Sequence, residues 1–312
     1  MASEFRSSFT RDNWSSYIHE LQDIICGGLE KADGKTKFYQ DVWQRDGGGG
    51  GRTRVMDHGA VFEKAGVNTS VVYGSVTDVM KRHLGIEGHS WWACGLSMVL
   101  HPENPFVPTT HANWRMFELY DASQTVIDRW FGGGADLTPY YLFEEDAIHF
   151  HTTLKDAMDP FGTDLYPRFK KQCDEYFRNT HRDNEMRGIG GVFYDYLRAG
   201  DLAGEDSLFR FQQANGDSFL KAYLPIVERR KDMVWQEHHR YWQEIRRGRY
   251  VEFNLIHDRG TLFGLKTNGR TESILMSLPP QVRFDYGYAP EPGSPEAQLL
   301  LACREPRDWA HL

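Results

Sequence analysis

Apolar residues recur along this chain with two different periods, and the longer period predicts the helices. Between residues 13 and 31 they fall at Trp14, Ile18, Leu21 and Ile25, the spacing of an amphipathic helix. The same spacing, with caps such as Ser75, predicts further helices. They cover residues 75–84, 144–158 and 167–179, two segments between 206 and 247, and a last one starting near 294.

Strand-like alternation and short apolar runs fill much of the remaining chain. They predict strands at 37–44, 61–73, 91–100, 109–120, 125–131 and 190–197, and four more at 249–256, 261–266, 272–278 and 282–288. The last four are joined by links too short for a crossover helix, and Asn268-Gly269 is a good hairpin turn. We therefore expect an α+β fold, a mostly antiparallel sheet covered by helices.

No linker or repeat divides the sequence, so we expect one domain over residues 1–312, with 1–12 as a flexible N-terminal extension. Five glycines at 47–51 are the only low-complexity segment. We interpret them as a mobile loop in a hairpin, and a lid over a site is the alternative.

Charge and composition exclude several classes of protein. The net charge of -8 argues against nucleic-acid binding, and no apolar run is long enough for a membrane helix. Four scattered cysteines without a C-x-x-C pair fit a reducing compartment, and the start lacks a signal peptide's apolar region, so we expect a cytoplasmic protein. The phosphate loop, the zinc helix and the nucleophile elbow are all absent, and 188–193 departs from the dinucleotide fingerprint.

The densest group of reactive side chains lies in the strand predicted at 109–120. Because side chains alternate along a strand, Thr109, His111, Asn113 and Arg115 share one face, and Trp114 points to the other. This face could combine proton transfer, hydrogen bonding and a carboxylate clamp. The alternative is the solvated face of an edge strand.

A second group is rich in arginine. Residues 246–270 hold six cations against two acids, a local charge of +4 that suits a small polyanion. Cations at a helix C-terminus would explain Arg246, Arg247 and Arg249, but not Arg259 or Arg270. In a third group, residues 130–141, three glycines precede Asp136 and would let the backbone approach a ligand closely. The alternative is that these glycines form a simple turn. Histidine spacing alone does not indicate a metal site.

Five long strings taken together resemble the oxygen-dependent coproporphyrinogen III oxidases. They are residues 62–68, 97–115, 130–141, 187–191 and 248–280, in an order that spans 14–309. The resemblance implies a homodimer with a flat antiparallel sheet between helices. It also implies oxidative decarboxylation of two propionates of a tetrapyrrole to vinyl groups. The oxidant would be O2, the products protoporphyrinogen IX, CO2 and H2O2, and no organic cofactor would be needed.

The resemblance also implies roles for individual residues. His111 matches the family's proton donor, and Asp258 matches the acid that engages the pyrrole N–H groups, with Asp136 and Arg259 as nearby candidates. Substrate-binding positions match Ser97, Asn113, Arg115, Asn268, Gly269 and Arg270, and Arg115 is also taken as catalytic. A divalent metal credited to bacterial members would fall on His101, His111, His151 and His181, although the segment at His181 is one residue longer here.

Two other functions stay open from the residues alone. A non-catalytic tetrapyrrole carrier would use the same arginines and aromatic rings without needing His111 or Asp258. A metal-dependent decarboxylase would need its histidines to converge through tertiary folding.

Overall fold

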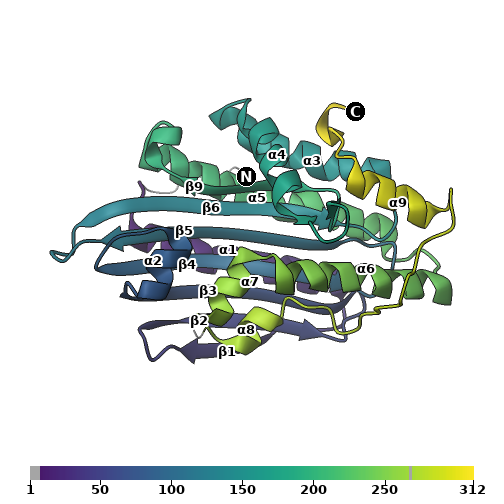
Figure 1. Ribbon diagram of the computed structural model, residues 1–312, viewed down its shortest axis with the longest axis horizontal. Coiled ribbons are helices and arrows are strands. Elements are labelled where there is room, and N and C mark those ends of the chain that lie inside the picture. Colours follow the sequence, from purple (N-terminus) through teal and green to yellow (C-terminus); the bar gives the residue numbers. More distant parts are fainter. Residues whose placement is uncertain (1–7, 267–268) are drawn as a thin grey trace.

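The computed structural model describes residues 8–266 and 269–312, which build one seven-stranded antiparallel sheet between two layers of helices (Figure 1). The strand order is β1-β2-β3-β4-β5-β6-β9, so each strand but the last pairs with its neighbour in sequence. The strands are β1 (Tyr39–Gln44), β2 (Gly49–Asp57), β3 (Phe62–Ser75), β4 (Ser90–Pro102), β5 (Thr109–Tyr120), β6 (Val126–Thr138) and β9 (Gly191–Leu197).

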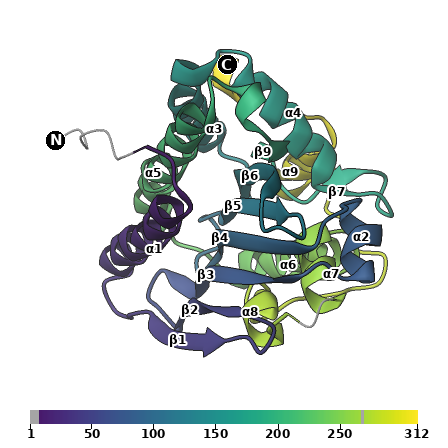
Figure 2. The same ribbon diagram turned by 90° about the vertical axis from the view of Figure 1, so that its left-hand side faces the viewer.

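Figure 2 shows the sheet from one end, with helices on both of its faces. On one side lie α1 (Arg11–Asp33), α3 (Glu144–Met158) and α5 (Glu205–Arg230). On the other lie α2 (Asp78–Leu84), α6 (Glu237–Ile256), α7 (Arg259–Lys266) and α8 (Thr271–Leu275). The remaining elements are α4 (Leu165–Tyr176), which packs on β9, the small hairpin of β7 (Arg178–Asn179) and β8 (Glu185–Met186), and α9 (Pro295–Arg304).

The main hydrophobic core lies on the side of α1 and α5, which we call the core face. Trp114 and Met98 are fully buried there, and Trp14 of α1 packs edge-on against Phe131. The Trp14 indole N–H also donates to the Cys94 carbonyl, 3.1 Å away. Helix α1 begins at a Thr10 cap and ends at Gly34 in the left-handed conformation, a common pair of helix boundaries.

Most elements predicted from the first 250 residues are confirmed. The predicted strand 109–120 and helix 144–158 match β5 and α3 residue for residue. Helix α2 begins at a Thr77 cap rather than at Ser75, which ends β3. The predicted strand 125–131 continues to Thr138, so the turn considered for the glycine-rich segment is wrong. Strand β2 was missed because its first three residues are glycine.

The four strands predicted near the C-terminus are wrong. Residues 249–256 continue α6, 261–266 lie in α7, 271–275 form α8, and 282–288 have no regular structure. Aromatic and β-branched residues there resemble a strand, but Trp242, Ile245, Tyr250 and Phe253 also lie on one buried helical face. Tertiary burial decides between the two periods. Gly269 N–H bonds to the Gly264 carbonyl of α7, not across a hairpin, and Asn268 is outside the described residues.

The glycine run is a hairpin between two strands, as predicted, but most of it is paired. Gly49, Gly50 and Gly51 belong to β2; Gly50 and Gly51 pair with both β1 and β3, and Gly49 pairs with β3. A Cβ on Gly51 would lie 2.3 Å from the Trp43 ring, so close packing explains the missing side chain. At the N-terminus, residues 8–12 are held: Phe9 packs against Phe131 and Phe209, and Arg11 and Asp12 already belong to α1.

Candidate functional site

The polar side chains of β5 lie on the sheet face opposite the core, which we call the site face. The register places His111 opposite Asp136, Asn113 opposite Ser97 and Gly134, and Arg115 opposite Gly95 and Gly132. This confirms the predicted alternation and excludes the edge-strand alternative, because β5 is paired on both sides. Ser97 is exposed although β4 is an inner strand, so the centre of the site face is open to solvent.

A buried charge network lies at one end of this face. Asp136 is 2% exposed; its carboxylate accepts from His111 Nδ1 at 2.8 Å and from Arg187 Nη2, 3.0 Å from both oxygens. Arg187 is equally buried, donates to Asn254 of α6 at 2.9 Å and lies against the rings of Phe177, Tyr250 and Phe253. Burial would raise the pKa of Asp136, but Arg187 and His111 outweigh it and hold that pKa below its usual value.

This network orients the imidazole of His111. Nδ1 donates to Asp136, so Nε2, the other ring nitrogen, is directed away from the carboxylate. The only described side chain with a polar contact to Nε2 is Asn113, whose amide nitrogen is 3.5 Å away. The side chain of His111 is 17% exposed, so Nε2 can exchange a proton with a ligand on the site face.

Two arginines lie beyond the histidine along the site face. Arg115 Nη1 donates to Asn113 Oδ1, and Arg115 Nη2 lies 3.1 Å from a carboxylate oxygen of Asp195 on β9. Arg259, at the start of α7, lies 3.7 Å from the other oxygen of Asp195. The guanidinium of Arg115 fits because Gly132 lies beneath it: a Cβ there would be 2.7 Å from Cζ. Guanidinium groups in this setting can hold a carboxylate.

Asp258 lies at the N-terminus of α7, next to these arginines. One carboxylate oxygen accepts from the backbone N–H and the hydroxyl of Thr261, at 2.7 and 2.8 Å, and the other accepts from the Tyr176 hydroxyl at 2.9 Å. Burial and the charge of Asp258 raise the pKa of Tyr176 to about 12, so the phenol stays protonated. Asp258 therefore caps a helix and carries a negative charge at the border of the site face.

A wall of aromatic rings flanks the two arginines. Trp91, Phe117 and Trp130 stack in sequence across β4, β5 and β6, with ring centroids 5.8 and 4.4 Å apart. Phe263 of α7 packs against this group, and Tyr176 stacks on Phe193, 4.3 Å between centroids, close to Arg115. A flat, electron-rich ligand finds both apolar surface and cations here.

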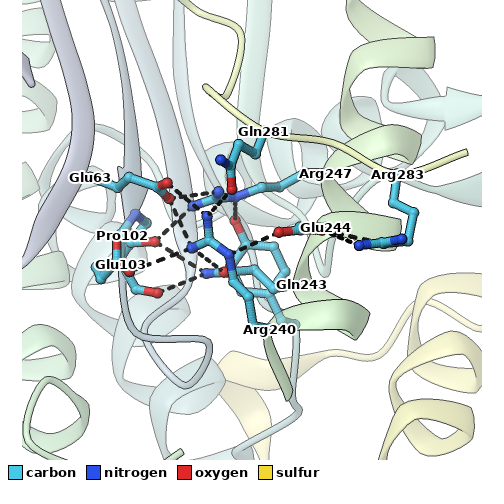
Figure 3. Close-up of polar contacts among 10 residues, drawn as sticks. Glu63, Pro102, Glu103, Arg240, Gln243, Glu244, Arg247, Gln281 and Arg283 are labelled. Carbon is cyan, nitrogen blue, oxygen red and sulfur yellow. Dashed lines mark hydrogen bonds and ion pairs between the residues drawn. The ribbon is translucent and has the colours of Figure 1, made fainter. Parts of the chain in front are cut away.

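The predicted arginine-rich island divides into two parts. Arg246 and Arg247 are buried in the middle of α6, not at a helix C-terminus, and pair with Glu185 and Glu63. Figure 3 shows that Glu63 also accepts from both Nη atoms of Arg240, at 2.9 and 2.7 Å, which ties α6 to β3. The pairs with Glu63 hold α6 over the sheet, the pair with Glu185 joins it to the β7–β8 hairpin, and only part of the island is left for a ligand.

The remaining cations of the island lie in different places. Arg249 pairs with Glu252 on its own helix, 3.1 Å away. Arg270 pairs with Asp41 of β1 and donates to Ser273, 3.1 Å away, near α8 rather than beside His111. The side chain of Arg259 is 60% exposed, and its one ion pair among the described residues is the loose contact with Asp195.

The four predicted metal-ligand histidines do not come together. His101 bonds to the Ser277 carbonyl at 2.8 Å and to Thr109, and His151, in α3, bonds to Tyr166 and the Ile189 carbonyl. His181 contacts His257 and Glu252. Burial lowers the pKa of His101 well below its usual value and that of His151 to about 3, so both rings are neutral. Within residues 8–266 and 269–312, no three histidine, cysteine or acidic side chains form a metal-binding group.

Sequence reasoning missed four residues of the site. Arg187 lies in the string 187–191 that supports the resemblance, yet nothing in its spacing pointed to Asp136. Asn254 likewise lies in the string 248–280, whereas Asp195 and Tyr176 carried no signal; each of the three reaches the site through tertiary packing of α6, β9 or α4.

The family model described as coproporphyrinogen III oxidase matches residues 13–309, nearly the whole chain. The chain therefore belongs to the coproporphyrinogen III oxidase family, whose enzymes act in haem biosynthesis as oxidative decarboxylases of a tetrapyrrole. No helix among the described residues is long and apolar enough to span a membrane.

Proposed function

We propose that this protein is the oxygen-dependent enzyme, which converts coproporphyrinogen III to protoporphyrinogen IX. In each of two rounds a propionate loses its carboxyl group as CO2 and a hydrogen from the carbon attached to the pyrrole ring, and a vinyl group forms. The two electrons and two protons released per round reduce O2 to H2O2. The oxidant is thus a second substrate, and the proposal needs no organic cofactor and no divalent metal.

The observation that carries the proposal is the arrangement of charge around the open centre of the site face. His111, oriented by the buried pair of Asp136 and Arg187, presents Nε2 to this opening. Arg115 and Arg259 provide cations beside it, where a propionate would bind. In the proposed mechanism these cations position the reacting propionate, and His111 transfers a proton on the site face.

The role proposed for Asp258 is electrostatic. Its carboxylate would pair with the pyrrole N–H groups and stabilise the positive charge that the ring gains as O2 takes up electrons. Aromatic rings such as Phe117 and Trp130 would flank the flat macrocycle. We further propose a cytoplasmic homodimer, for which sedimentation equilibrium should give twice the chain mass of 36.1 kDa.

The test is to supply purified protein with coproporphyrinogen III and air, without added cofactor, and to measure vinyl product and peroxide. We expect both, with two molecules of H2O2 for each molecule of protoporphyrinogen IX, and neither under argon. Tetrapyrrole binding without turnover in air would instead support the carrier. Loss of turnover with a chelator, restored by a divalent metal, would support the metal-dependent decarboxylase.

Asp258→Asn gives a sharper test of the site. Asparagine still accepts from Thr261 and still caps α7, so thermal stability should stay close to that of the unchanged protein. Turnover should fall by about 100-fold or more, because the negative charge is lost. Near-normal turnover in this variant would refute the proposed role of Asp258.

A further inference from the structure

Both cations of the proposed propionate site share one carboxylate of the protein itself. Asp195 places Oδ1 3.1 Å from Arg115 Nη2 and Oδ2 3.7 Å from Arg259 Nη2. A carboxylate with one oxygen toward each of two guanidinium groups is the arrangement expected for a bound propionate. The site therefore already contains a carboxylate of the protein among its cations.

A β-bulge brings this carboxylate to the site face. In the pairing of β6 with β9, Phe131 lies opposite Leu197 and Gly133 opposite Tyr194, so Asp195 and Tyr196 together oppose Gly132. Tyr196 takes up the extra residue with a left-handed φ of 54°, which is unusual for a tyrosine. Gly132, the residue that leaves room for Arg115, thus lies opposite the bulge that presents Asp195.

The exposure of the three side chains indicates an accessible contact. The side chains of Arg115 and Arg259 are 40% and 60% exposed, whereas that of Asp195 is 20% exposed. Ion pairs this open to water are weak, and a ligand can replace one partner. By contrast, Asp136 and Arg187 are almost fully buried, so that pair is not available for exchange.

We infer that Asp195 is an internal counter-ion: before substrate binds, its carboxylate occupies the position between Arg115 and Arg259 that a substrate propionate takes. It keeps the two guanidinium groups converging before substrate arrives, and it yields them when the propionate binds. With Asp195 present the three side chains carry a net charge of +1, which matches a single carboxylate. Asp195 thus acts through the arginines as a positioning residue that weakens carboxylate binding. This inference rests on the proposed function only for the identity of the carboxylate.

The experiment compares Asp195→Asn with Asp195→Glu, which keeps the charge, and with the matched control Asp128→Asn. Asp128, on β6, pairs with Arg198, the residue after β9, through bonds of 2.9 and 2.7 Å, and contacts neither Arg115 nor Arg259. The probe is coproporphyrin III, the oxidised and air-stable tetracarboxylate, titrated by quenching of tryptophan fluorescence at low and high salt. The KM and kcat for coproporphyrinogen III are measured alongside.

We expect Asp195→Asn to bind the porphyrin about five- to tenfold more tightly, with a steeper dependence on salt, because an internal competitor is gone. KM should fall in parallel while kcat stays within about threefold. The glutamate variant and the Asp128 control should bind within about twofold of the unchanged protein. A purely structural role predicts the opposite, lower stability and no gain in affinity.

Unchanged or weaker porphyrin binding by folded Asp195→Asn would overturn the inference. If this variant does not fold, Asp195→Ser replaces it, and failure of both to fold also overturns the inference, since a displaceable counter-ion is not needed for folding. The proposed function fails separately, when the unchanged protein shows no turnover in air. In that case the porphyrin titration still reports on Asp195.

Discussion

The buried pair of Asp136 and Arg187 should be the most strongly coupled pair in the site. Arg187→Met removes both bonds to Asp136 and the bond to Asn254 and leaves a carboxylate that is 2% exposed with His111 as its remaining partner. Such an uncompensated buried charge costs about 3–5 kcal/mol. Asp136→Asn leaves the Arg187 cation buried without an anion and should cost a similar amount.

The double variant removes both charges together. Its remaining cost comes from unsatisfied amide groups, about 1–3 kcal/mol. The sum of the free-energy costs of the two single variants should therefore exceed the cost of the double variant by about 3 kcal/mol or more. Equilibrium urea unfolding of all four proteins at pH 7, at one fixed protein concentration, measures this difference.

A second cycle on an exposed pair serves as the control. Arg198 and Asp128 form a similar two-bond pair, but their side chains are 45% and 32% exposed, so their coupling should stay below about 1 kcal/mol. Coupling below about 0.5 kcal/mol at Asp136 and Arg187 would refute the reasoning that burial makes this pair essential.

Two further predictions concern the room beneath Arg115 and the ion pairs of Figure 3. Gly132→Ala places a Cβ 2.7 Å from the Arg115 guanidinium and should lower kcat/KM at least about tenfold. The control Gly27→Ala, with no atom within 4 Å of the added Cβ, should leave kcat/KM unchanged. Equal values of kcat/KM for the two variants would contradict the packing argument. At Glu63, burial raises the pKa, but Arg240 and Arg247 outweigh it and hold that pKa below its usual value of 4.5. The Glu63 carboxylate therefore stabilises the fold above about pH 4.5, and this effect is lost as the pH falls through the folded-state pKa. The unfolding free energy of the unchanged protein should therefore exceed that of Glu63→Gln by a constant amount at neutral pH and by less below pH 4.5, and a difference independent of pH would count against the ion pair.

Comparison of α6 with β5 shows why some elements could be predicted and others could not. In β5 the period-two pattern and the β-branched and aromatic content agree, so both its bounds and its polar face were correct. In residues 249–256 the composition favours a strand while the spacing from Trp242 onward also fits a helix. The ion pairs of Arg246 with Glu185 and of Arg247 with Glu63 join α6 to the β7–β8 hairpin and to β3, segments far away in sequence.

The sequence by itself determined the placement of His111, Asn113 and Arg115 on one face of a strand, because strand alternation is a local property of the backbone. It also determined the family, because long strings of residues were matched in order. Only the tertiary structure decided which partners these side chains have. Arg187 reaches Asp136 across 51 residues, and Asp195 reaches Arg115 through a bulge whose position depends on the pairing of β6 with β9. Such contacts depend on how separate elements pack, and no local pattern of residues encodes that packing.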